Sequence, residues 1–197
     1  MKTAVRNKNR VNLTLTTNMN IRRIVTASDD KGLSYVKQDS IADNIDKPLE
    51  EISPEFTVVN LWTTTGQSLS PEFKEDPVAH QKKVPVSPSK NNTSFRFVNF
   101  PPENYLAQLE DSALKERIFE RAGFDKNEPK NSKRHPLMHQ TQTIDYAIVL
   151  SGEIFLLLDK EEVSLKAGDV VIQCGTTHTW NNRSNKDCLM GFVVLGA

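Results

Sequence analysis

The sequence has few cysteines, no excess charge of either sign and no long apolar run. Its two cysteines, Cys174 and Cys188, lack the Cys-x-x-Cys spacing of a redox or zinc motif, and so few cysteines favour a reduced compartment, which predicts the cytoplasm. Lys plus Arg and Asp plus Glu number 25 each. The composition therefore predicts no nucleic-acid partner, because that binding depends on neutralising phosphates. Apolar runs such as 154–158 are strand-sized, which predicts no membrane span.

Three regions follow one another along the chain. Residues 1–18 contain four basic residues, no acid and no apolar stretch of signal-peptide length, which predicts a disordered lead. We expect residues 19–133 to supply N-terminal strands, a Pro-rich loop at 66–94 and a helix, all packing on a barrel core formed by residues 134–197. The whole chain has the size of one domain with a single core.

Short apolar segments separated by turn residues indicate an all-β fold. Residues 21–26 and 33–37 flank a Gly-containing turn, which is typical of a hairpin. Further strands are predicted at 56–64, 95–100, 141–150, 153–158, 162–165, 169–173 and 188–195. The only helical periodicity lies in residues 103–122, which predicts one or two short helices outside the strands. Many short strands joined by tight turns form a sandwich or a jelly-roll-like β-barrel.

Polar side chains recur at alternate positions on two of the predicted strands. The first row is His139, Thr141, Thr143 and Asp145, and the second is His178, Trp180 and Asn182. Because strand side chains alternate between faces, each row points one way, and a polar row inside a barrel must line a cavity or leave buried groups unpaired. We therefore expect a small-molecule site where the two rows meet.

Two histidines and one carboxylate suit a divalent metal. His139, Asp145 and His178 would form the facial arrangement that binds non-haem Fe(II) and also suits Mn, Ni or Zn. Two alternatives stay open. The same three residues could perform acid–base catalysis without metal, with Asp145 orienting a histidine, or the histidines could be hydrogen-bonded core residues. His135, in a charged segment before Pro136, is expected to be an exposed loop residue.

Two motifs resemble those of the cupin superfamily. His139, Thr141, Asp145 and Gly152 occupy the positions of the first His, the second His, the Glu and the closing Gly of the first cupin motif. The second motif is matched by Gly168, Gly175, His178 and Asn182. Thr141 and Asp145 depart from the family pattern, since one usual ligand is absent and the carboxylate is one methylene shorter. The resemblance implies a cupin barrel with an N-terminal strand extension and an incomplete set of metal ligands.

The resemblance also sets the functional expectations. The stretch from Met138 to Ile154 is similar to a subgroup of small cupin-domain proteins of bacteria and fungi, some encoded near secondary-metabolism genes. It implies an enzyme of oxygenase, isomerase, dehydratase or decarboxylase type acting on a small organic molecule, and a homodimer. The alternative is a non-catalytic metabolite-binding or sensor cupin. The expected substrate pocket consists of Thr141, Thr143, Gln173, Trp180 and Asn182.

Overall fold

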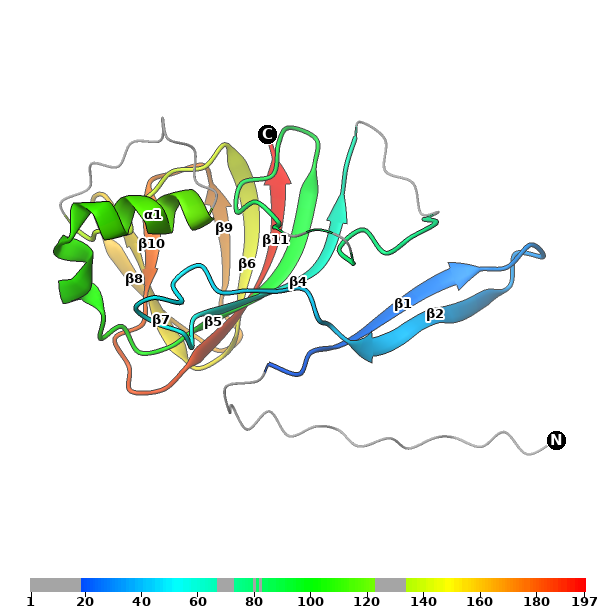
Figure 1. The fold of residues 1–197 in the computed structure, drawn as a ribbon, viewed down its shortest axis with the longest axis horizontal. Helices are drawn as coiled ribbons and strands as arrows, with labels where there is room; N and C mark the ends of the chain where they lie inside the picture. Colours follow the sequence, from blue (N-terminus) through cyan, green and yellow to red (C-terminus); the bar gives the residue numbers. More distant parts are fainter. Residues whose placement is uncertain (1–18, 67–72, 80, 82, 123–133) are drawn as a thin grey trace.

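The computed structural model describes residues 19–66, 73–79, 81, 83–122 and 134–197, and the expected lead at 1–18 lies outside them (Figure 1). Within these ranges the chain forms eleven strands, a 3-10 helix and an α-helix. In chain order they are β1 Arg22–Ser28, β2 Ser34–Ile41, β3 Ile45–Asp46, β4 Thr57–Thr64, β5 Thr93–Phe100, η1 Leu106–Glu110, α1 Ser112–Ala122, β6 Thr143–Ser151, β7 Glu153–Leu158, β8 Glu162–Lys166, β9 Val170–Cys174, β10 His178–Asn181 and β11 Cys188–Gly196.

The strands form a large sheet, a small sheet and a separate hairpin. The six-stranded sheet has the order β3-β4-β5-β11-β6-β9, the three-stranded sheet has the order β10-β7-β8, and β1 pairs only with β2. β11 lies between β5 and β6 and is antiparallel to both. The large sheet therefore combines β3, β4 and β5 with strands that follow residue 134.

The inner faces of the two sheets pack against each other. Their shared core contains Val98 of β5, Val149 of β6, Leu156 of β7 and Met190 of β11. The inward residues of β6 alternate with outward ones such as Tyr146, as the period-2 pattern predicts. The predicted all-β fold is confirmed, and the region expected to be helical contains the α-helix.

The predicted helical region at 103–122 is split in two. A 3-10 turn, η1, precedes α1, and Asp111 separates them. Asp111 Oδ1 accepts hydrogen bonds from the backbone N–H groups of Ala113 at 2.9 Å and Leu114 at 3.2 Å, so it acts as an N-cap. Ile118 is buried on the inner side of α1 and packs in a second apolar cluster with η1. This helix lies across one end of the barrel (Figure 1).

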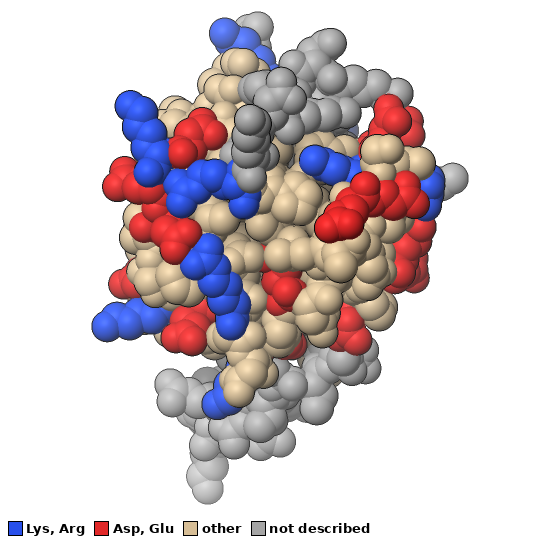
Figure 2. Space-filling view, turned by 90° about the vertical axis from the view of Figure 1, so that its left-hand side faces the viewer, with Lys and Arg blue, Asp and Glu red and all other residues tan. Residues whose placement is uncertain are grey.

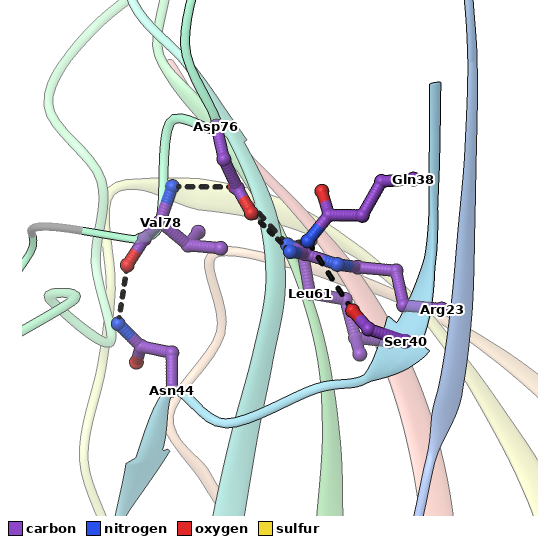
Figure 3. Close-up of polar contacts among 7 residues, drawn as sticks. All are labelled: Arg23, Gln38, Ser40, Asn44, Leu61, Asp76 and Val78. Carbon is purple, nitrogen blue, oxygen red and sulfur yellow. Dashed lines mark hydrogen bonds and ion pairs between the residues drawn. The ribbon is translucent and has the colours of Figure 1, made fainter. Parts of the chain in front are cut away.

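The β1–β2 hairpin projects from the barrel and is anchored at its base (Figure 1). Arg23 reaches from β1 to Asp76, and its Nη1 donates to the carbonyl of Leu61 at 2.9 Å (Figure 3). Asp76 in turn accepts from the backbone N–H of Val78 at 3.1 Å. Asn44 donates to the carbonyl of Val78 at 2.7 Å. One buried ion pair thus ties the hairpin, β4 and the segment around residue 78 together.

Charged side chains of both signs are mixed over the face shown in Figure 2, which is the side of the molecule that carries α1. This mixture agrees with the balanced composition. None of the helices in the described part of the chain is long and apolar enough to span a membrane.

Candidate functional site

A cavity of about 140 Å³ lies between the two sheets. Its wall is mainly apolar, with Phe100 and Phe192 from the large sheet and Ile118 from α1. A cavity of about 150 Å³ can hold a molecule the size of benzene, so this one fits a small ligand. Six polar residues interrupt the apolar wall: Arg96, His139, Thr141, Asp145, His178 and Thr179.

Strand pairing places His139 and His178 side by side. The two residues form an isolated antiparallel bridge, in which the His139 N–H donates to the His178 carbonyl at 3.0 Å and the His178 N–H donates back at 2.9 Å. Side chains of such a cross-strand pair project to the same side. The imidazole centroids are accordingly 4.5 Å apart, with the rings tilted by 53°. The predicted meeting of the two polar rows therefore occurs at this bridge.

Both imidazoles are held in the same tautomer. His139 Nδ1 lies 2.9 Å from the carbonyl of Leu137, and His178 Nδ1 lies 2.9 Å from the carbonyl of Thr176. A carbonyl oxygen only accepts, so each Nδ1 carries the proton and each Nε2 carries a lone pair. Burial and the neighbouring His178 lower the pKa of His139 to about 3, and burial also lowers the pKa of His178. Both rings are neutral at physiological pH.

Asp145 lies on the inward face of β6 and lines the cavity. Its Oδ1 is buried and has no hydrogen-bond partner. Burial raises the pKa of Asp145, while a hydrogen bond from Thr143 and the positive charge of Arg96 oppose this shift. Among the described residues, no group of three or more His, Cys, Asp or Glu side chains could hold a metal ion. Asp145 therefore does not join the two imidazoles as a third ligand in this structure.

Arg96 is a buried cation in the cavity wall that the sequence analysis missed. It lies on the inward face of β5, and its side chain is only 5% exposed. Burial lowers the pKa of Arg96 to about 10, against the opposing effects of Asp145 and Asp46, so it stays positively charged at neutral pH. One signal in the sequence could have identified it. Arg96 shares the inward face of its strand with Ser94, Val98 and Phe100, which are uncharged, because these residues occupy alternate positions.

The five residues expected to form the pocket divide into two groups. Thr141 and Trp180 line the cavity. The other three are buried and do not line the cavity. Thr143 is 2.7 Å from the Thr141 hydroxyl, Gln173 donates to the Thr176 carbonyl at 3.0 Å, and Asn182 donates to the carbonyl of Phe100 at 2.8 Å. Asn182 also accepts from Ser184, so it holds a loop together.

His135 was expected to be an exposed loop residue, and this expectation is wrong. Its side chain is buried, and its Nε2 lies 3.1 Å from Oε1 of Glu103, which is equally buried. Its Nδ1 accepts a hydrogen bond from the backbone N–H of Leu137 at 3.1 Å. The charged residues around His135 in the sequence predicted exposure, but His135 pairs with Glu103, which is distant in the sequence. His135 does not line the cavity.

Known sequences match about a third of the chain. Residues 127–195 match the family model described as "Cupin domain". Phomopsin biosynthesis cluster protein C' of Diaporthe leptostromiformis is 58% identical over 63 residues, which are 31% of this chain and 33% of that protein. The cupin-domain-containing oxidoreductase virC of Hypocrea virens is 38% identical over 58 residues, 29% of this chain and 30% of that protein. The matches thus span about a third of these relatives' length.

Solved structures resemble a larger share of the chain at low sequence identity. The Cnp3 cupin domain of Schizosaccharomyces pombe is 14% identical with a TM-score of 0.41, covering 89% of this chain and 88% of that one. A putative ethanolamine utilization protein Q of Salmonella typhimurium is 10% identical with a TM-score of 0.41, covering 91% and 99%. The family model, the two sequence motifs and the two-sheet barrel agree, and the chain carries a domain of the cupin superfamily.

Proposed function

We propose that this protein is an enzyme that acts on a small, largely apolar organic molecule held in the cavity, with His139 and His178 in contact with the reacting group. The observation that carries this proposal is the pair of neutral imidazoles in one tautomer on the cavity wall, with His178 buried and His139 half-buried. Relatives named cupin-domain-containing oxidoreductases and biosynthesis cluster proteins support an enzyme of small-molecule metabolism.

The histidine pair offers two proton acceptors to a bound molecule. Each Nε2 lone pair can accept a hydrogen bond or a proton from a hydroxyl or an acidic C–H group, while Nδ1–H stays bonded to a backbone carbonyl that fixes the ring. The low pKa keeps His139 unprotonated at neutral pH and makes it a weak base, so its Nε2 acts there as a hydrogen-bond acceptor. Trp180 and Phe192 border the same space, with their rings in edge-to-face contact. This arrangement suits isomerase, dehydratase or decarboxylase chemistry.

A divalent metal bound by the same histidines is the second candidate, and the tautomers favour it. Ligating histidines usually donate the other ring N–H to a carbonyl or carboxylate, as both do here. Fe, Mn, Ni or Zn would supply oxygenase or Lewis-acid chemistry. Asp145 as the third ligand remains a prediction, since it does not belong to a three-donor group in this structure.

The test combines elemental analysis with turnover. Protein purified without a His tag is analysed for metal and incubated with a small-molecule extract of its host. His139→Asn and His178→Asn are compared with His135→Asn, a variant of a buried histidine outside the cavity. We expect mass spectrometry to find a compound consumed by the wild type and by His135→Asn but not by the two cavity variants. A compound that is bound but never consumed would contradict the enzyme proposal and favour the metabolite-binding or sensor alternative.

We propose a second copy of this chain as the protein partner, as the cupin resemblance implies. The outer face of the large sheet exposes large apolar side chains from neighbouring strands, among them Tyr146, Val170 and Ile172. Exposed apolar patches of this kind commonly mark protein interfaces. Light scattering should give a dimer mass for the wild type and a monomer mass for Ile172→Glu. A monomeric wild type would contradict the proposal.

We also propose that the protein works in the cytoplasm. Cys174 is exposed and Cys188 is buried, and both are free thiols. Free thiols of this kind fit a reducing compartment. Imaging the tagged full chain in its host would test this location, and a signal confined to an organelle or the medium would contradict it.

A further inference from the structure

Arg96 is a buried cation in the cavity without an acidic partner at ion-pair distance among the described residues. Among the described residues, its hydrogen bonds use only Nη2, which donates to the Pro85 carbonyl at 2.5 Å and to the Ser94 hydroxyl at 2.6 Å. Nε is buried without a partner. A guanidinium has five N–H donors in a planar fork. Nε and Nη1 therefore retain donor capacity in a place where water has little access.

Asp145 provides the complementary charge in the same cavity wall. Its Oδ1 has no partner, and the hydrogen bond to its carboxyl group comes from Thr143. Arg96 and Asp145 influence each other through space but form no ion pair. Leaving buried polar groups unpaired costs about 1 to 3 kcal/mol each and more for charged groups. A ligand that pairs with both groups would remove this cost.

We infer that Arg96 and Asp145 form a recognition site for a small carboxylic acid that carries a hydroxyl or amino group next to its carboxylate. The carboxylate accepts hydrogen bonds from Arg96, and the neighbouring O–H or N–H donates to Asp145. The rest of the ligand is apolar, since Phe100, Val98 and Phe192 form the adjoining wall. The inference rests on the proposed function, because it names the substrate class of the same cavity.

The size of the cavity limits the ligand body. About 140 Å³ matches a whole ligand of around six carbon atoms. A guanidinium suits a carboxylate better than an ammonium does, because its parallel N–H groups can bind both oxygens. The leucine skeleton therefore provides a suitable probe series: 4-methylpentanoate, 2-hydroxy-4-methylpentanoate, L-leucine and, as a neutral control, 4-methylpentanamide.

Calorimetric titration of the full chain with these four compounds tests the inference. For the wild type we expect the hydroxy acid, leucine or both to bind at least about 10-fold more tightly than the neutral amide, the range of one charged hydrogen bond. Arg96→Met should remove this preference. Asp145→Asn should weaken the binding of the hydroxy acid and of leucine but leave the affinity for 4-methylpentanoate unchanged. The matched control is Arg22→Met, since Arg22 pairs with Asp39 on the exposed hairpin and should not alter binding.

Arg96→Lys guards against a folding defect, because it keeps the charge and should retain part of the preference for acids even if Arg96→Met unfolds. Equal wild-type affinity for the amide and the acids would overturn the inference, as would an Arg96→Met variant that folds and keeps the preference. The histidine variants separate the two proposals. Loss of turnover in His139→Asn together with an unchanged acid preference in Arg96→Met would overturn only the inference about the substrate. If the preference for acids depends on Arg96 but the protein consumes no compound in the turnover assay, only the enzyme proposal would be overturned.

Discussion

The histidine pair in the cavity wall should make the protein lose stability in mild acid. The pKa of His139 is about 3 in the folded chain, below the usual value of 6.5. Between these values an unfolded His139 binds a proton that the folded one does not. The stability linked to this residue is therefore complete above about pH 6.5 and decreases as the pH falls toward 3.

The magnitude follows from the two pKa values. Each pH unit within the window changes the free energy of unfolding by about 1.4 kcal/mol for one histidine, and the loss between pH 7 and pH 5 is about 2 kcal/mol. His178, whose pKa is also lowered, adds to this loss. His139 is half-buried, so solvent screening reduces the effect only in part.

Urea unfolding at pH 7, 6 and 5 in the presence of a chelator measures this loss. His139→Gln removes the titrating group, so its unfolding free energy should change between pH 7 and pH 5 by about 2 kcal/mol less than that of the wild type. Carboxylates that titrate in the same range are present in both proteins, and their effects cancel. The same pH dependence in wild type and variant would refute the claim that folding lowers the pKa of His139 and keeps the ring neutral.

Two further predictions concern positions outside the cavity. Gly152 has φ +80°, and an added Cβ would lie 2.6 Å from the Asp187 carbonyl oxygen, whereas Gly168, with φ +96°, has open space around it. Gly152→Ala should therefore lower the free energy of unfolding by about 2 kcal/mol or more and Gly168→Ala by about 1 kcal/mol, and equal losses in thermal or urea unfolding would contradict the close contact. Asp76→Asn should increase hydrogen exchange throughout β1 and β2, since it leaves buried Arg23 unpaired, at a cost of about 3 kcal/mol. The control is Asp39→Asn, which breaks the exposed Arg22–Asp39 pair on the same hairpin and should lower the free energy of unfolding by less than about 1 kcal/mol. Similar hydrogen exchange in the Asp76→Asn and Asp39→Asn variants would show that Arg23 does not anchor the hairpin.

The strands and the faces of their side chains could be predicted from the sequence. Alternation and turn residues located β6 through β9 within two residues, and they placed His139 and Asp145 on one face. The neighbours of each strand could not be predicted, since a period of two fixes a face but not the pairing order. Arg96 was missed for this reason, because only the order β5-β11-β6 brings it to the same wall as Asp145.

Long-range partners also explain the other differences. His135 lies among charged residues in the sequence, and its burial depends on Glu103, which is 32 positions away. Asn182 matched a cupin motif position and was expected to contact substrate, yet its amide bonds to the backbone of Phe100 and Lys186. Local patterns identify polar residues that point inward, but they do not distinguish a residue in a cavity wall from one that holds a loop.

The most direct test of the histidine site is a long-range ¹H–¹⁵N NMR spectrum of the wild-type imidazoles at pH 6 to 7. The structure predicts that His139 and His178 are both neutral, with the proton on Nδ1. The unprotonated Nε2 of each ring would then be available to a substrate or a metal. An imidazolium at either position, or a proton on Nε2 of either ring, would contradict the account of the site.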